Sequence, residues 1–452
     1  MSRSLAEPPR RTPVLAEHEV VVLGGGPAGI AAAVAAARAG RSTLLVERYG
    51  FLGGMGTAAG VTNFCGLHAN VHGELRRVVR GVADGLLERI DRLGGLSAPH
   101  TLFKGKICAQ AYDNAAYKLA ADELVLGSGA QLLFHALGAG VLMRSPGEIE
   151  ALLVETKSGR GAILGKLFID CSGDGDLSAW AGAPFEKGDG AGNLLYPSTM
   201  FRVAGVDPQR AAGAWERMAA LMKQAARRGR RFPRRNPIVR PQKHDTEWRV
   251  NVTQLANPDG SAIDGTDAAQ LSRGEVQGRR QALEFFEFLR EAVPGFERAY
   301  LLEIAPQVGI RETRRVRGAY QLSEEDVLSC ASFEDTIGVN GWPIEAHVPG
   351  EVVFRWPPIP ESRGFNHLPY RMIVPLAIDN LLVAGRCASM THGGQSAARV
   401  SGACFAMGEA AGAAADLALA AGVRPRGLDV SLLQRRLESA GAYLGLSLKE
   451  IA

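Results

Sequence analysis

Residues 20–29 read VVVLGGGPAG, and this stretch decides the fold of the N-terminal part of the chain. The run Val20–Leu23 is continuously apolar, which is typical of a strand buried on both faces of a parallel sheet. An Ala-rich stretch, Ile30–Ala39, follows the glycine-rich turn and predicts a helix that Gly40 ends. A second apolar run, Ser42–Val46, completes a strand–helix–strand unit, which requires two parallel strands.

The spacing of the glycines in this turn indicates a binding site for a dinucleotide. Gly24, Gly26 and Gly29 form the pattern GxGxxG. The first glycine permits a tight turn, the second lets the backbone approach a pyrophosphate, and the third lets helix and strand pack closely. The helix N-terminus then presents free N–H groups to the phosphates. Glu47 ends the second strand, where an acid can accept hydrogen bonds from both ribose hydroxyls. An ordinary tight turn does not explain the position of this acid.

Composition places the chain among ordinary globular proteins. It has 452 residues, of which 46% are hydrophobic and 22% are charged, and these values argue against wholesale disorder and fibrous architecture. The length favours two structural units over one or four. The formal net charge of +4 is small for this length, so bulk charge gives no argument for a nucleic acid or a membrane as partner.

The cysteines and the N-terminal residues bear on metal sites and location. No two of the 6 cysteines form a CxxC pair, which disfavours a redox dithiol and a zinc ribbon, and we expect no metal site. The N-terminal residues contain no apolar core of signal-peptide length. No uninterrupted stretch of about 18 apolar residues occurs. We therefore expect a cytoplasmic protein without membrane insertion.

Periodicity in the remaining sequence predicts a strand meander and a late return to the same sheet. Residues 1–17 read as a flexible lead-in. The expected helices are 74–93, 114–123 and 397–420, and the expected strands are 131–136, 141–144, 149–156, 162–170, 372–374 and 381–384. A further short helix is expected in the tail beyond residue 424.

We therefore predict that the chain leaves the nucleotide-binding domain, builds an inserted domain and comes back. The nucleotide-binding domain would comprise residues 17–185 and 366–420. Residues 186–365 would form an inserted α+β substrate or cap domain, and residues 421–452 a C-terminal helical tail. The fold class is α/β, with a Rossmann-like domain of parallel sheet plus β-meander.

The glycine-rich opening joins four further segments in a pattern that resembles a known family. These segments are GGMGT at 53–57, IDCSGDGDLSAWAGA at 169–183, GIRETRR at 309–315 and NLLVAGRCASMTHGGQSAARV at 380–400. Over about residues 19–420 the chain resembles the FAD-dependent oxidoreductase family of the glutathione-reductase fold, related to the fumarate reductase flavoprotein group. The resemblance implies that FAD is the cofactor and that a hydride passes between a small organic substrate and flavin N5.

The resemblance also implies cofactor-binding roles for individual residues. Gly53 and Gly54 match a second phosphate loop, and the turn Gly173-Asp174 matches one that touches the cofactor. Gly385-Arg386 stands where many relatives carry Gly-Asp, and an arginine there fits a phosphate contact. A helix starting near Ala398-Arg399 is expected to aim its N-terminus at the flavin C2 carbonyl. The full set expected to bind FAD is Gly24, Gly26, Pro27, Ala28, Gly29, Glu47, Arg48, Gly53, Gly54, Met55, Thr57, Gly173, Asp174, Gly385, Arg386, Ala398 and Arg399.

Four residues are the main candidates for the chemistry, and His367 is a fifth. Cys65 and His68 follow the second glycine loop and could serve as nucleophile, base or covalent tether, or be a buried thiol and a structural imidazole. Arg311 belongs to a dense basic cluster and is the best candidate for a carboxylate clamp, because guanidinium binds carboxylate bidentately. A charged face paired with acids is the alternative for this cluster. His392 is a candidate proton donor, and His367 is another.

Alternatives from other functional classes remain open at this point. The run from Lys223 to Lys243 contains nine Lys or Arg and no acid, which raises an FAD-containing RNA-modifying protein. Three prolines spoil an amphipathic helix there and only Phe232 offers stacking, so no specific nucleic acid is expected. An oxygen-using flavin oxidase or monooxygenase and an electron-transfer subunit are further alternatives. Because a second GxGxxG is absent, we expect a small-molecule substrate and an external electron acceptor or donor, with a homodimer as a possible assembly.

Overall fold

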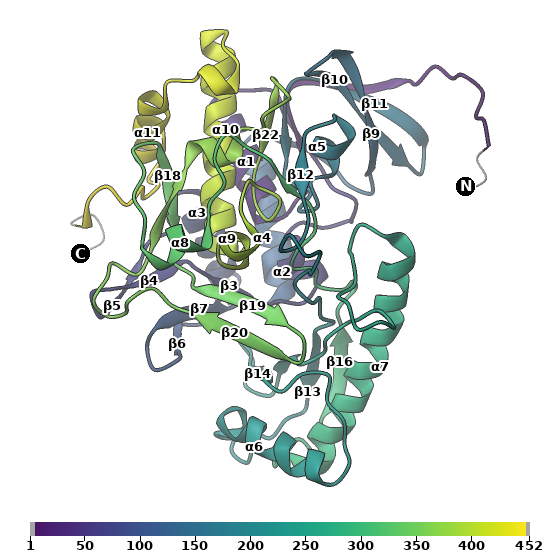
Figure 1. The fold of residues 1–452 in the computed structure, drawn as a ribbon, viewed down its shortest axis with the longest axis vertical. Coiled ribbons are helices and arrows are strands. Elements are labelled where there is room, and N and C mark those ends of the chain that lie inside the picture. Colours follow the sequence, from purple (N-terminus) through teal and green to yellow (C-terminus); the bar gives the residue numbers. More distant parts are fainter. Residues whose placement is uncertain (1–4, 449–452) are drawn as a thin grey trace.

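The computed structural model describes residues 5–448 as an α/β protein built on one large sheet (Figure 1). The sheet has seven strands in the order β8-β2-β1-β11-β10-β9, with β22 also paired to β11. Strands β8, β2, β1, β11 and β22 are parallel, and β10 and β9 continue as an antiparallel meander. The strands are β1 (Val14–Leu23), β2 (Thr43–Val46), β8 (Gln131–Leu133), β9 (Leu137–Ser145), β10 (Glu148–Thr156), β11 (Gly159–Asp170) and β22 (Leu381–Val383). The predicted fold class is confirmed.

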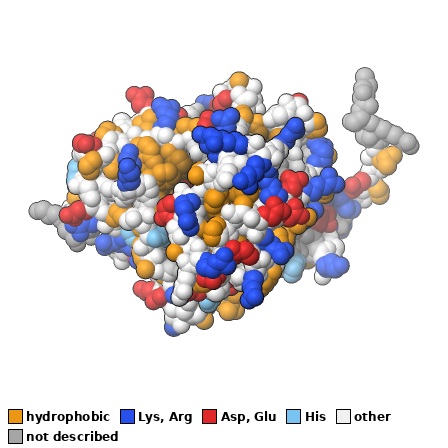
Figure 2. Space-filling model, turned by 90° about the horizontal axis from the view of Figure 1, so that it is seen from below, with side chains coloured by type: hydrophobic (Ala, Val, Ile, Leu, Met, Phe, Trp, Pro, Cys, Tyr) orange, Lys and Arg blue, Asp and Glu red, His pale blue; other side chains and the backbone are white. Residues whose placement is uncertain are grey.

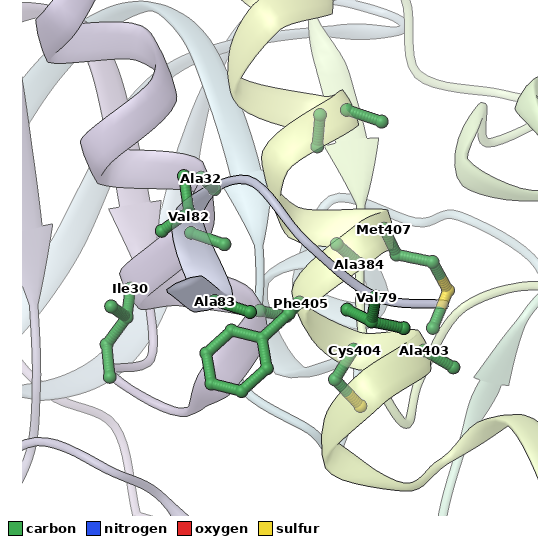
Figure 3. Close-up of a cluster of buried hydrophobic side chains, with 14 of the residues drawn as sticks. Ile30, Ala32, Val79, Val82, Ala83, Ala384, Ala403, Cys404, Phe405 and Met407 are labelled. Atoms are coloured by element: carbon green, nitrogen blue, oxygen red, sulfur yellow. The ribbon is translucent and has the colours of Figure 1, made fainter. Parts of the chain in front are cut away.

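The return of the chain to its first sheet is visible in two contacts. Strand β22 pairs in parallel with the end of β11, so that Leu381 lies beside Phe168. Helix α10 (Ser401–Ala421) packs along α1 (Pro27–Arg38), the helix that follows β1. The two helices approach closely because glycines face the partner backbone, and a Cβ on Gly408 would lie only 2.0 Å from the carbonyl oxygen of Ala28. Figure 3 shows the apolar cluster around this contact, with side chains from α1, α3 (Val82–Arg92) and α10.

The expected helix at 397–420 is two helices in the structure. Helix α9 covers His392–Ala398 and ends at Arg399, and Val400 then adopts an extended conformation before α10 begins. The prediction that a helix starts near Ala398 and Arg399 is therefore wrong. Within residues 5–448, α10 is the one helix long and apolar enough to span a membrane, and 78% of its most apolar stretch is buried inside the protein. Burial in the core accounts for its composition.

Residues between β12 (Phe185–Glu186) and β21 (Asn366–Pro369) form a second core beside the first. A four-stranded antiparallel sheet, β14-β15-β13-β16, is covered by α6 and the long helix α7, which occupy the lower part of Figure 1. These elements are β13 (Phe201–Ala204), α6 (Ala214–Arg227), β14 (Ile238–Pro241), β15 (Trp248–Asn251), α7 (Ala268–Ala292) and β16 (Tyr300–Ile304). Part of the same segment, β18 (Thr336–Asn340), packs on α10 instead. The exact domain boundaries stay a prediction.

The basic run at 223–243 is divided among several environments. It begins on α6 and ends beyond β14, and Arg234 within it is buried with 1% exposure. Arg230 pairs with Glu291 on α7 at 3.1 Å. Figure 2 views the molecule from below, and on this face Lys and Arg side chains are interspersed with acidic and apolar ones. A mixed surface of this kind is typical of a solvated face rather than a nucleic-acid groove.

Four local expectations are corrected by the structure. Residues 74–93 form strand β5 and then α3, because the chain reverses at His72 and Gly73, both at positive φ, to pair β4 with β5. The expected strand at 372–374 is absent. Met372 and Ile373 instead end the 3-10 helix η1 (Tyr370–Ile373), which lies between Pro369 and Pro375. Strand β1 starts at Val14, inside the expected lead-in, because it pairs with β11 from Val14 onward. Strand β8 lies parallel to β2 and outside the meander.

The remaining elements complete the described chain, and the tail helix is as expected. They are α2 (Met55–Ala58), β3 (Asn63–Cys65), β4 (His68–Val71), β5 (Glu74–Arg77), β6 (His100–Leu102), β7 (Ile107–Ala111), α4 (Asn114–Gly127), α5 (Asp176–Trp180), β12 (Phe185–Glu186), β17 (Arg315–Val316), α8 (Glu324–Leu328), β19 (Ile344–Val348), β20 (Glu351–Arg355), β21 (Asn366–Pro369), η1 (Tyr370–Ile373), η2 (Pro425–Gly427) and α11 (Val430–Ser439).

Candidate cofactor and substrate site

A large cavity lies where the nucleotide-binding elements meet the cap sheet. Its volume is about 280 Å³. One part of its wall is the glycine loop after β1 and the loops that follow β2 and β11, and another part comes from β3, β14, β15 and β19. The loops that the sequence pattern selects are therefore continuous with a chamber that cap residues and further residues of the nucleotide-binding domain line together. Small-molecule and cofactor sites commonly lie at such junctions.

The glycine loop has the geometry that its spacing predicts. Gly24 has a φ of +101°, and a Cβ there would lie 2.4 Å from the carbonyl oxygen of Cys171. A Cβ on Gly29 would lie 1.8 Å from the carbonyl oxygen of Gly24. At Gly26 the nearest atom would be 3.7 Å away, so this position opens onto the cavity. No side chain caps α1 at Gly26, and its first N–H groups are available to a pyrophosphate.

Glu47 lies at the predicted place at the end of β2. Its carboxylate is buried, lines the cavity, and accepts hydrogen bonds from the N–H of Gly25 at 2.6 Å and of Tyr49 at 3.0 Å. Both oxygens keep lone pairs for a ribose hydroxyl. Arg48 also lines the cavity and donates to Gln307 at 2.9 Å. These residues, with the open glycine loop, fit the adenosine half of a dinucleotide.

The second glycine loop contributes two of its four predicted residues to the cavity wall. Gly54, at a φ of +53°, and Met55 line the cavity. Gly53, at a φ of +110°, donates its N–H to the carbonyl of Gly25, and Thr57 donates to the carbonyl of Leu52 at 2.7 Å. Gly53 and Thr57 therefore shape the loop and hold it against the first one.

The two late motifs meet through Arg386. Its Nε donates to the carbonyl of Gly173 at 2.8 Å, and its Nη2 donates to Asp174 at 2.8 Å. Its Nη1 donates to the carbonyl of Ile310. Gly173, Gly385 and Arg386 line the cavity, whereas Asp174 lies behind Arg386 and fixes its orientation. Pro27, Ala28 and Arg399 also line the cavity, and Gly29 and Ala398 lie outside its wall.

The structure separates the four candidates for the chemistry into two pairs. Cys65 and Arg311 line the cavity. Burial raises the pKa of the Cys65 thiol to about 12, so the neutral thiol predominates. His68 does not line the cavity, and burial lowers its pKa to about 4. His392 also lies outside the wall, with its Nδ1 2.9 Å from the buried carboxylate of Glu312. Because neither side chain lines the cavity, neither His68 nor His392 can exchange a proton directly with a molecule bound there.

The arginines at 311–317 divide between the two interpretations that the sequence left open, a carboxylate clamp and a charged face paired with acids. Arg314 pairs with Asp176 at 2.8 Å, Arg315 with Glu312, and Arg317 with Glu186. Arg311 differs, because its Nη1 donates to the carbonyl of Tyr196 at 2.8 Å and to Ser198 at 2.9 Å. The charged-face interpretation therefore applies to its neighbours. Arg311 itself is buried in the cavity wall with 5% exposure.

Three more arginines gather around Arg311, and sequence reasoning did not predict their meeting. We call Arg234, Arg249, Arg311 and Arg399 the cap arginine cluster. Burial lowers the pKa values of all four, and neighbouring guanidinium groups lower those of Arg234, Arg311 and Arg399 further. Arg249 enters from β15, Arg234 from the loop before β14, and Arg399 from the turn between α9 and α10. More than a hundred residues separate Arg249 from Arg399, so no local motif joins them.

One carboxylate, Glu345 on β19, lies among these arginines. It accepts hydrogen bonds from Trp342 Nε1 at 2.8 Å and from His347 Nε2 at 3.1 Å. Burial pushes the pKa of Glu345 upward, but the hydrogen bond from His347, the charge of Arg399 and the hydrogen bond from Trp342 lower it to about 2. Glu345 is therefore ionised. Burial and the charge of Arg311 lower the pKa of His347 well below its usual value, so the imidazole is neutral.

Comparison with known proteins agrees with this geometry. The profile of the family described as "FAD dependent oxidoreductase" matches residues 19–437, and the chain belongs to this family. It is an enzyme and a flavoprotein whose cofactor is FAD, and the glycine loops, the uncapped α1 and Glu47 are suited to hold that cofactor. No curated protein matches the sequence.

Similar folds occur among solved structures, with low sequence identity. A geranylgeranyl bacteriochlorophyll reductase-like protein from Thermoplasma acidophilum is 13% identical, with a TM-score of 0.46 over 96% of this chain and 95% of that one. The p-nitrophenol 4-monooxygenase PnpA from Pseudomonas putida DLL-E4 is 12% identical, with a TM-score of 0.45 over 96% of this chain and 83% of that one.

Proposed function

We propose that this flavoenzyme is a dehydrogenase or reductase that transfers a hydride between a small organic substrate and FAD. FAD supplies N5 as the hydride acceptor or donor when it is bound. The observation that carries the proposal is the continuity of the cavity, because the dinucleotide loops open directly into a chamber that is lined in part by the cap. A substrate in that chamber would lie next to the cofactor and away from bulk water.

The residues of the chamber support binding and orientation of a substrate. Arg311 is held by Tyr196 and Ser198, so its guanidinium is fixed before a substrate arrives. Trp342, Leu102 and Val400 provide an apolar wall. Glu345 is the ionised acceptor in the wall and can receive a hydrogen bond from a substrate hydroxyl or amine. We propose that Arg386, held by Asp174, contacts the cofactor and stays in one orientation during turnover.

We also propose that the chain has the glutathione-reductase fold and is related to the fumarate reductase flavoprotein group. Both proposals rest on the GIRETRR segment at 309–315 and the return segment at 380–400, both of which contribute residues to the cavity wall. The electron acceptor or donor is an external molecule in this proposal, because the sequence contains one GxGxxG and the described chain one dinucleotide loop of that kind.

An anaerobic reduction assay tests the proposal. The purified holoprotein is mixed with panels of organic acids, alcohols and amines, and loss of the oxidised flavin absorbance is recorded without oxygen. Bleaching by a compound, followed by slow reoxidation in air and fast reoxidation by an added quinone dye, is the expected result. Rapid reoxidation by air, or a C4a-adduct spectrum, would favour an oxidase or monooxygenase instead. The proposal would be contradicted if no organic compound bleached the oxidised flavin and none reoxidised the reduced flavin in the absence of oxygen.

A further inference from the structure

The cap arginine cluster carries more positive charge than the surrounding protein neutralises. Arg249, Arg311 and Arg399 line the cavity, Arg234 lies outside its wall, and the ionised carboxylate of Glu345 acts on all four. No Asp or Glu within residues 5–448 lies within 4 Å of any of these four guanidinium groups, in contrast to the neighbouring Arg314, Arg315 and Arg386. Buried charges that lack a partner are strongly unfavourable. The chamber is therefore built to receive an anion.

Two of the arginines that line the cavity also carry a buried N–H without a hydrogen-bond partner among the described residues. Arg249 is buried with 6% exposure and lines the cavity, and its Nη1 donates to the carbonyl of Val61 at 2.6 Å. Its Nε is buried and has no hydrogen-bond partner among the described residues. The Nε of Arg399 is likewise buried and has no hydrogen-bond partner among the described residues, while its Nη2 donates to the backbone carbonyl of Glu345 at 3.1 Å. A buried unpartnered N–H costs stability unless a ligand satisfies it.

The wall beside these donors is apolar and aromatic. Trp342 and Val400 are buried there and form one cluster with Ile107, Leu102 and Cys65. Phe103 lies 4.6 Å from Phe354 between ring centroids, and both rings line the cavity. An anion bound at Arg249 and Arg399 would thus place the rest of its molecule against carbon. Inorganic anions gain nothing from such a wall, whereas an organic acid gains apolar burial.

We propose that Arg249 and Arg399, together with Arg311, bind the carboxylate of an organic acid whose apolar body packs against Trp342, Val400 and the Phe103–Phe354 pair. This inference rests on the proposed function, since it names the substrate class of the same chamber. The FAD pyrophosphate is not this anion in our account, because the open loop at Gly26 and the uncapped α1 serve it. Carboxylate is favoured because a planar carboxylate matches the guanidinium fork in two parallel hydrogen bonds.

Titration calorimetry on the FAD-loaded protein tests the assignment without relying on turnover. Benzoate and hexanoate are the probes, and benzamide and hexanamide are their neutral counterparts. At least one acid should bind at least tenfold more tightly than its amide, since charge-assisted hydrogen bonds distinguish them. Equal affinity within each acid–amide pair would overturn the proposal, and so would tighter binding of inorganic phosphate than of either acid. Flavin content and flavin bleaching are measured separately, so failure of carboxylate binding is distinguishable from failure of the flavoenzyme assignment.

Substitution of Arg249 distinguishes a role in binding the acid from a purely structural role. Arg249→Met should weaken binding of the acid at least tenfold, and it should raise or preserve the thermal midpoint of the acid-free protein, because an unpaired buried charge is removed. Arg217→Met, at an exposed arginine of α6 outside the cavity, is the matched control and should bind the acid normally. A lower midpoint together with unchanged acid affinity in Arg249→Met would assign Arg249 to the fold and refute its role at the site. Should Arg249→Met fail to fold, the acid–amide comparison on the unaltered protein decides the question.

Discussion

Replacing Gly26 by alanine separates the cofactor role of the glycine loop from its structural role. Gly26 has φ −74° and ψ −176°, a conformation that any residue adopts, and its Cβ would meet no protein atom closer than 3.7 Å. Gly26→Ala should therefore leave the apoprotein as stable as before, or about 0.5 kcal/mol more stable through a less flexible unfolded chain. The new methyl group, however, would occupy the space in which a pyrophosphate approaches the backbone. Overpacking of this kind costs about 1–3 kcal/mol, which raises the Kd for FAD roughly tenfold to a hundredfold.

Gly29→Ala is the matched comparison in the same loop. Its Cβ would lie 1.8 Å from the carbonyl oxygen of Gly24, so the first turn of α1 must move and the apoprotein should lose about 1–3 kcal/mol or more. Urea unfolding of both apoproteins measures stability, and titration with FAD, followed by quenching of flavin fluorescence, measures affinity. If Gly26→Ala binds FAD as tightly as the unaltered protein, the pyrophosphate does not pass Gly26 and the assignment of this loop is refuted.

Three further predictions concern groups away from the chamber. Burial raises the pKa of Glu409 to about 7 from 4.5, so between these pH values the folded state holds a proton that the unfolded state has lost. The free energy of unfolding should therefore fall by up to about 3 kcal/mol as pH rises from about 4.5 to above 7. Urea unfolding measures this fall, which should be absent in Glu409→Gln. Gly408→Ala should destabilise the α1–α10 contact by about 1–3 kcal/mol in the same assay, with Gly427→Ala, which meets nothing within 4 Å, near zero. His392→Ala should destabilise the protein by about 1–3 kcal/mol through loss of its contact with buried Glu312, yet leave the rate of flavin reduction within about twofold; a collapse of that rate with normal stability would restore His392 as a catalytic residue.

The nucleotide-binding half of the fold was predictable because its signals are local. The glycine spacing, the buried strand Val20–Leu23 and the terminal Glu47 lie within one strand–helix–strand unit, and the structure reproduces it. The return of β22 to β11 was also predictable, since a short apolar run and an Ala-rich helix mark it. The break between α9 and α10 was missed, because nothing in the Ala-rich composition shows that Val400 is extended.

The chamber was only half predictable, because its residues meet through tertiary packing. Cys65 and Arg311 were selected from motifs and do line the cavity. Arg249, Glu345 and His347 stand in unremarkable sequence on two cap strands, and only the docking of β15 and β19 onto the cavity brings them together. His68 and His392 were selected for residue type and position near the right loops. Their side chains serve buried contacts or lie outside the wall, which residue type alone does not reveal.

A crystal structure of the FAD-loaded protein would locate the cofactor in the chamber. We expect one FAD per chain, with the pyrophosphate beside Gly24–Gly26 and the isoalloxazine in the chamber bordered by Cys65, Arg311 and Arg386. An isoalloxazine outside that chamber, or a chain that binds no FAD when purified with it, would refute the assignment of the chamber as the flavin site.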